Sequence, residues 1–99
     1  MVQGVALMSS GRAAWMLDAM PRFLLEHVHS ARECGVVFAS FKAFDSPLRH
    51  QPTMGSCDFG THRIWWDVDA ATAADALAQL PWYVADRTRA IRVRDIQTP

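Results

Sequence analysis

The chain has 99 residues, of which 51% are hydrophobic and 20% are charged, and its formal net charge is zero. This length and composition are typical of one soluble globular domain, here residues 1–99, and the zero net charge argues against a polyanionic partner. The two cysteines, Cys34 and Cys57, lack a metal-ligand spacing, so we expect free thiols and no metal. Residues 1–10 are too short for a membrane span or a signal peptide, which favours a cytoplasmic protein.

The first half of the chain is predicted to form strand, helix and strand. Residues 2–9 are apolar and uncharged, as in a buried strand. Apolar residues then recur at helical spacing over residues 12–34, with Pro21 as a kink or first residue and Gly35 as the stop. Residues 36–44 are rich in β-branched and aromatic side chains, which predicts the second strand.

The second half begins with a long loop and continues as strand, helix and strand. Residues 45–58 have loop composition, and loops of this length are often functional. Residues 59–69 form the third predicted strand. An alanine- and leucine-rich helix follows, capped by Asp69 or Thr72 and ended or bent by Pro81. Residues 88–96 alternate between apolar and charged side chains and form the last strand.

This order predicts an α+β, ferredoxin-like βαββαβ domain, with a four-stranded antiparallel sheet and two helices on one face. Trp65 and Trp66 must then point to opposite faces of their strand. One tryptophan packs under the helices. The other, with Phe38 or Phe41 from the neighbouring strand, forms an apolar patch on the open face. We expect a second copy to cover this face, giving a homodimeric α+β barrel.

The stretch HRIWWDVDAATAADALAQLPWYVADRTRAIRVRDI resembles the C-terminal half of muconolactone isomerase-like proteins of the dimeric α+β barrel superfamily. The shared features are a strand ending in an acid, an alanine and leucine helix, the LP at its end, an aromatic residue two positions on, and a closing strand. The FDS at residues 44–46, after a helix opened by Trp15, is similar to the small darcynin-like proteins. The resemblance implies the dimeric fold and an isomerase-like or cyclase-like activity without a cofactor.

Five polar residues are candidates for acid–base chemistry. His62 or His50 could move a proton, because the pKa of histidine lies near working pH. Arg63 or Arg49 could hold a substrate carboxylate. Tyr83 could donate a hydrogen bond to a carbonyl or enolate oxygen. The alternatives for His62 and Arg63 are that one is buried and hydrogen-bonded and the other is a surface residue of the strand ladder. Arg49 and His50 could belong to a solvated polar loop, and Tyr83 could serve only as half-buried packing.

The remaining candidates shape a pocket for a small apolar or aromatic ligand. Trp65, Trp66 and Phe38 would line it, and His27 on the apolar stripe of the first helix could reach it. His29, two residues further on, lies on a different face of the predicted helix and is expected to be solvated. HVH is therefore a poor metal pair on a helix, although it would be a plausible pair on a strand. Cys57 could act as a nucleophile only if its pKa were lowered.

Taken together, the sequence predicts a small homodimeric enzyme that isomerises or cyclises a small cyclic acid, lactone or polyketide-like compound by proton transfer. Two alternatives stay open. One is a non-catalytic ligand-binding or accessory domain on the same fold. The other is a small monooxygenase of the superfamily, for which His27 would be the axial ligand of a haem.

Overall fold

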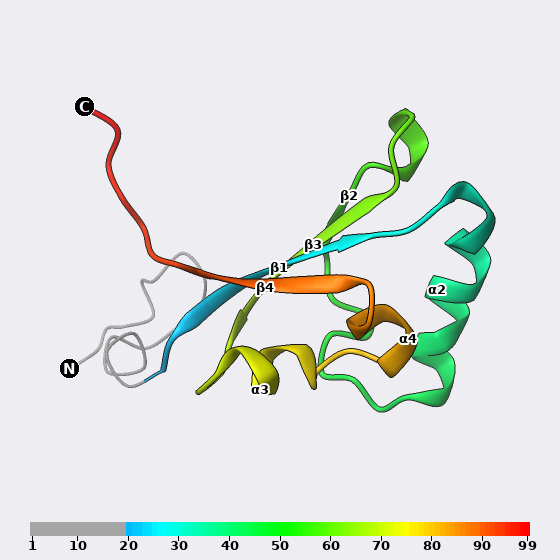
Figure 1. The fold of residues 1–99 in the computed structure, drawn as a ribbon, viewed down its shortest axis with the longest axis horizontal. Coiled ribbons are helices and arrows are strands. Elements are labelled where there is room, and N and C mark those ends of the chain that lie inside the picture. The colour runs from blue at the N-terminus through cyan, green and yellow to red at the C-terminus, as the bar shows by residue number, and fades with distance from the viewer. Residues whose placement is uncertain (1–19) are drawn as a thin grey trace.

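The computed structural model describes residues 20–99, and its centre is a four-stranded antiparallel sheet in the order β2-β3-β1-β4. The strands are β1 (Arg22–Val28), β2 (Met54–Gly55), β3 (Arg63–Asp69) and β4 (Thr88–Val93). Figure 1 shows the long strands β1, β3 and β4 crossing the molecule and the C-terminal tail leaving the sheet. The coarse expectation of an α+β domain with a four-stranded antiparallel sheet is confirmed.

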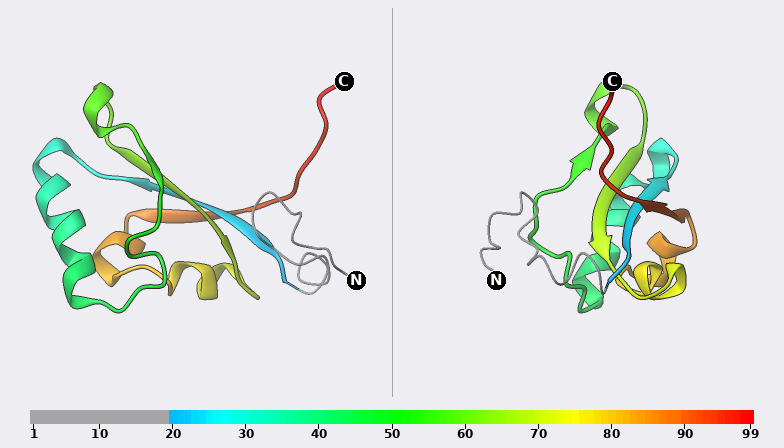
Figure 2. Two further views of the ribbon diagram at one scale, coloured as in Figure 1. Left: turned by 180° about the vertical axis from the view of Figure 1, so that it is seen from behind. Right: turned by 90° about the vertical axis from the view of Figure 1, so that its left-hand side faces the viewer.

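The helices are short and lie on one face of the sheet (Figures 1 and 2). They are α2 (Cys34–Ser40), α3 (Ala73–Leu77) and α4 (Trp82–Ala85), with single 3-10 turns η2 (Ala31–Glu33), η3 (Phe41–Ala43) and η4 (Cys57–Phe59). Each α-helix contributes one buried residue to the core, namely Val37, Ala76 and Val84. Within residues 20–99, no helix is long and apolar enough to cross a membrane.

The core follows from the period-two pattern of the two central strands. Phe23 and Leu25 of β1 and the even-numbered residues 64–68 of β3 all point to the helical face and are at most 6% exposed. The alternate residues of both strands face the other side of the sheet. The prediction that Trp65 and Trp66 lie on opposite faces is confirmed, because Trp66 is in the core and Trp65 is only half-buried.

The helix predicted over residues 12–34 is wrong in its second half, where Arg22–Val28 form the central strand β1. Phe23, Leu25 and His27 also alternate at period two, and pairing with β3 on one side and β4 on the other stabilises this pattern. The predicted strand 2–9 and the start of the helix lie outside the described residues.

The strand predicted over residues 36–44 is also wrong, because this segment forms α2 and η3. A capping box precedes it, in which the Glu33 carboxylate accepts a hydrogen bond from the backbone N–H of Ser30 at 2.9 Å. Val37 and Phe41, four residues apart, then face the core together, which outweighs the β-propensity of the sequence. Gly35 lies in the first turn of α2 and does not end a helix.

The two phenylalanines expected beside Trp65 on the open face lie elsewhere. Phe38 and Phe41 are helical and do not lie on a neighbouring strand. The Phe41 ring lies 6.0 Å from that of Trp66, on the helical side of the sheet. The apolar patch predicted for the open face therefore lacks both phenylalanines.

The C-terminal half agrees more closely with expectation. Residues 45–53 are irregular, followed by the short strand β2 and the turn η4. Strand β3 occupies the last seven residues of the predicted segment 59–69. Thr72 caps α3 by accepting a hydrogen bond from the N–H of Asp75, and α3 ends before Pro81. Strand β4 begins at Thr88 as predicted.

Candidate metal centre

Two histidines and two cysteines meet at the end of the sheet where β1 leaves and β3 begins. They are His29, Cys34, Cys57 and His62, and their donor atoms all lie within 4.8 Å of one another. Cys34 Sγ lies 3.2 Å from His29 Nε2 and 3.2 Å from His62 Nδ1. Cys57 Sγ lies 3.6 Å from His29 Nε2. We call these four residues the Cys2His2 cluster.

Each member of the cluster is held by a different local feature. The backbone N–H of His29 donates to the carbonyl of His62 at 3.0 Å, which extends the β1–β3 ladder and sets the two histidines side by side. Cys34 is the first residue of α2, just after the capped turn η2. Cys57 lies in η4, and Gly60 (φ 98°) ends that turn in the left-handed conformation that glycine tolerates best.

The spacing of the cluster fits a tetrahedral metal ion. With metal–sulfur and metal–nitrogen bonds of about 2.3 Å and 2.0–2.1 Å, a tetrahedral zinc ion separates sulfur and nitrogen donors by about 3.5 Å. The observed sulfur–nitrogen distances of 3.2, 3.2 and 3.6 Å bracket this value. The other donor pairs also lie within 4.8 Å, a spacing at which the four residues could hold one metal ion.

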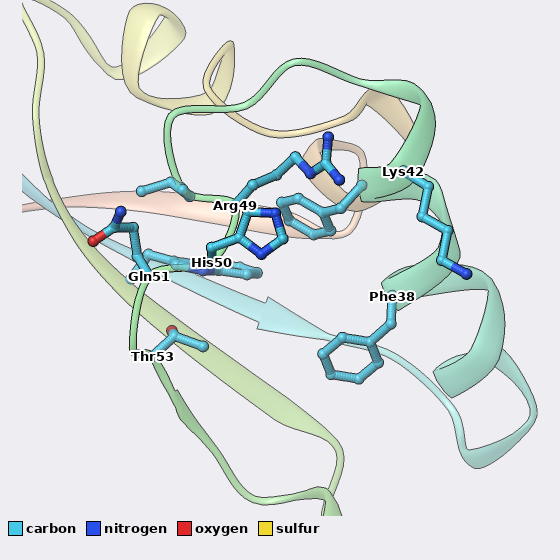
Figure 3. A pocket seen from close by; sticks show the side chains of 9 residues that line it. Phe38, Lys42, Arg49, His50, Gln51 and Thr53 are labelled. Atoms are coloured by element: carbon cyan, nitrogen blue, oxygen red, sulfur yellow. The ribbon is translucent and has the colours of Figure 1, made fainter.

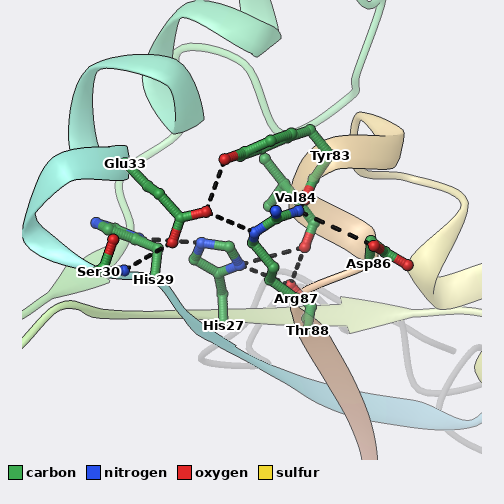
Figure 4. Close-up of polar contacts among 9 residues, drawn as sticks. All are labelled: His27, His29, Ser30, Glu33, Tyr83, Val84, Asp86, Arg87 and Thr88. Carbon is green, nitrogen blue, oxygen red and sulfur yellow. Dashed lines mark hydrogen bonds and ion pairs between the residues drawn. The ribbon is translucent and has the colours of Figure 1, made fainter.

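A hydrogen-bonded relay behind the cluster orients His29 (Figure 4). The Thr88 hydroxyl donates to the Val84 carbonyl at 2.6 Å. His27 Nδ1 lies 3.2 Å from the same carbonyl and 2.9 Å from Thr88 Oγ1, so these oxygens assign the proton to Nδ1. His27 Nε2 must then accept from His29 Nδ1 at 3.0 Å. This leaves the lone pair of His29 Nε2 directed at the two sulfur atoms.

This arrangement is the outer-shell support that metal-binding histidines use, in which the second ring nitrogen donates to a fixed acceptor. Burial lowers the pKa of His27, and the neighbouring His29 lowers it further. Burial also lowers the pKa of His29, with a smaller effect from His62. Both rings are therefore neutral near pH 7, which is the form that can bind a metal ion.

The thiol of Cys57 is not an activated nucleophile. Burial raises its pKa, and the nearby Cys34 raises it further. Both cysteines are free, as predicted. A raised pKa keeps the Cys57 thiol protonated at neutral pH, whereas a bound metal ion would displace the proton and hold the thiolate.

A second polar network fixes the turn that carries Cys34 (Figure 4). The Glu33 carboxylate accepts hydrogen bonds from the Tyr83 hydroxyl at 2.6 Å and from Arg87 Nε at 2.8 Å. The Arg87 guanidinium also lies 3.8 Å from the centre of the Tyr83 ring. The Ser30 N–H, together with Tyr83, lowers the pKa of Glu33 to about 2. The network ties α4 to the start of α2.

The structure separates the residues that the sequence suggested for acid–base chemistry. His62 belongs to the Cys2His2 cluster, and the Tyr83 hydroxyl is bonded to Glu33. His50 and Arg49 lie in the long loop and line a pocket with Phe38 and Trp66. His62 and Tyr83 do not line that pocket.

Arg63 and Trp65 lie on the opposite face of the sheet from the cluster. Both contact Glu26, through Arg63 Nη1 at 3.5 Å and Trp65 Nε1 at 3.4 Å. Glu26 also pairs with Arg89 at 2.8 Å. Hydrogen bonding from Arg89 lowers the pKa of this carboxyl.

His27 lies between the sheet and the helices, but it reaches this place from a strand, is fully buried and does not line the pocket of Arg49 and His50. The prediction that His29 is solvated is wrong, because only 6% of it is exposed. The sequence did contain a signal for the cluster. On a strand, HVH places both rings on one face, and CDFGTH brings a cysteine and a histidine to the adjacent hairpin. The helical interpretation of residues 12–34 concealed it.

Comparison of the chain with family models, with curated proteins and with solved structures found no match. Only the geometry of the site therefore indicates a function for this chain.

Proposed function

We propose that this protein binds a late first-row transition-metal dication, with zinc the best fit, through His29, Cys34, Cys57 and His62. The observation that carries the proposal is the convergence of two thiols and two imidazoles within 4.8 Å. The His27 relay supports it, because it directs the donor nitrogen of His29 into the cluster. Thiolates and imidazoles favour zinc and its neighbours over calcium and magnesium, which prefer oxygen ligands.

Four protein donors complete a tetrahedral shell, which is typical of zinc sites that hold the ion and leave no position for a substrate water. The ion would join the β1–α2 turn to the β2–β3 hairpin. Three of the four ligands are only half-buried, so ions can enter from solvent. We therefore favour metal holding, for stability or for metal transfer, over metal-assisted hydrolysis.

Cobalt(II) titration of the reduced protein tests this proposal. Tetrahedral binding to thiolates should produce visible d–d bands and near-ultraviolet charge-transfer bands that saturate at a single ion per chain, and zinc should displace them. Cys34→Ser, Cys57→Ser and His62→Ala should each weaken or abolish these bands.

His50→Ala is the matched control, because His50 is a histidine outside the cluster. It should give the wild-type spectrum. A Cys57→Ser variant that retained the charge-transfer intensity and affinity of the wild type would contradict the assignment of ligands.

We further propose the ferredoxin-like topology and a homodimer through the open sheet face. The strand order β2-β3-β1-β4, with helices in the connections from β1 to β2 and from β3 to β4, supports the topology. Leu24, Trp65 and Ile91 lie half-buried among ion pairs on the face opposite the helices, which supports an interface there. A reducing cytoplasm would keep both thiols available to a metal ion.

The acid–base enzyme expected from the sequence stays a prediction. Its support is now limited to the pocket that Arg49 and His50 share with Phe38 and Trp66. Turnover of a lactone or enol substrate that is lost in His50→Ala would establish it.

A further inference from the structure

A pocket of about 290 Å³ lies between the end of α2, the turn η3 and the loop that leads to β2 (Figure 3). Its apolar surface is aromatic in large part, and consists of Phe38, Phe41, Leu48 and Trp66. The Trp66 ring lies 6.0 Å from the Phe41 ring, which also lines the pocket, and 6.1 Å from the His27 ring. None of the four residues of the Cys2His2 cluster lines the pocket, which is therefore distinct from it.

The polar residues that line the pocket carry only positive or neutral groups. They are Lys42, Arg49, His50, Gln51 and Thr53, with no aspartate or glutamate among the lining residues. Within residues 20–99, arginine ion pairs are formed by Arg22, Arg63, Arg87 and Arg89. Neither Arg49 nor Lys42 pairs with an acid in this part of the chain, so the described lining of the pocket carries a net positive charge.

The backbone at His50 supports a binding role. His50 is the sole non-glycine residue with positive φ (65°) among residues 20–99. This conformation costs free energy for a residue with a Cβ, and such costs are often found where a side chain is aimed at a ligand. Figure 3 shows the His50 ring directed toward the middle of the pocket, beside the Arg49 side chain.

We propose that this pocket binds a small aromatic carboxylic acid. Its ring would contact Phe38, Phe41 and Trp66, and its carboxylate would accept charge-assisted hydrogen bonds from Arg49, with His50 and Lys42 nearby. A pocket at the low end of the usual range of about 300–1,000 Å³ suits a single-ring acid. This inference is independent of metal binding and adds a second ligand to the protein.

The test is an NMR titration of the full-length, isotope-labelled protein with benzoate, run once with zinc and once with a chelator. Benzamide has the same ring without the charge, and acetate has the charge without the ring. Benzoate should bind about tenfold tighter than benzamide, because hydrogen bonds to a charged group are the stronger ones. It should also bind tighter than acetate, and its chemical-shift changes should centre on residues 38–53 and Trp66.

Arg49→Gln should weaken benzoate binding about tenfold. Arg92→Gln, which removes an exposed arginine that does not line the pocket, should leave it unchanged. Equal affinities for benzoate and benzamide, or for benzoate and acetate, would overturn the proposal. The expected dissociation constant for benzoate is about 1 mM. The absence of a saturable chemical-shift change at about 10 mM benzoate, ten times that value, would also overturn the proposal. None of these results depends on whether the metal site exists.

Discussion

Replacing His27 by leucine tests whether the buried relay supports metal binding. His27 is fully buried and accepts a hydrogen bond from His29 Nδ1 at 3.0 Å. In the His27→Leu variant, His29 Nδ1–H has no partner in a site that is only 6% exposed. A buried unpaired donor costs about 1–3 kcal/mol. The imidazole can avoid this cost by moving its proton to Nε2, the atom that must bind the metal.

The expected result is a zinc affinity about 10–100-fold below that of the wild type, the usual effect of losing an outer-shell partner. His27→Gln is the matched variant, because a glutamine amide can accept from His29 and donate to the Val84 carbonyl. It should retain an affinity close to the wild-type value.

Affinity is measured by competition for zinc with a coloured chelator, and circular dichroism of each variant confirms that it is folded. A folded His27→Leu protein with wild-type affinity would refute the role of the relay. If His27→Gln lost as much affinity as His27→Leu, the packing of the imidazole, and not its hydrogen bonds, would be responsible.

Zinc at a hundredfold excess over its dissociation constant should stabilise the fold by about 2.7 kcal/mol and raise Tm by about 10–20 °C. Cys57→Ser should abolish most of this shift in a thermal melt, and an equal shift in that variant would count against the cluster. Zinc binding at pH 7 should release at least one proton, because burial raises the pKa of Cys57 and keeps its thiol protonated; calorimetry that gave the same heat in buffers of different ionisation enthalpy would contradict this. Glu33→Gln should lower the free energy of unfolding at pH 7, because the pKa of Glu33 falls from 4.5 to about 2 on folding. A lowered pKa stabilises above the unfolded-state value, so the deficit of the variant should shrink as pH falls from about 4.5 to about 2. A deficit that stayed constant in chemical unfolding across this range would show that the carboxylate charge is not its source.

The C-terminal half was predictable because local signals and tertiary contacts agree there. The side chains of β3 and β4 alternate only at the period of two that a strand requires. Thr72 lies where its side chain can cap α3. Loop composition also indicated the irregular segment that contributes Arg49 and His50 to the pocket.

The first half was not predictable in the same way. The apolar residues of Arg22–Val28 fit both a helix and a strand, and pairing with two neighbouring strands decides between them. Cys34–Ser40 have strand-forming side chains, yet the capping box at Ser30 and the burial of Val37 favour a helix. Local propensity is weak compared with such contacts.

The sequence by itself determined the class of the domain, the course of its second half and the donors available to a metal ion. Only the tertiary structure decided that these donors meet. The contacts of Cys34 with His62 and of Cys57 with His29 each join residues 28 positions apart. Such contacts depend on the register of β1 against β3 and on the turn at Gly60, which the HVH and CDFGTH spacings by themselves do not fix. The Cys2His2 cluster is therefore a property of the folded sheet.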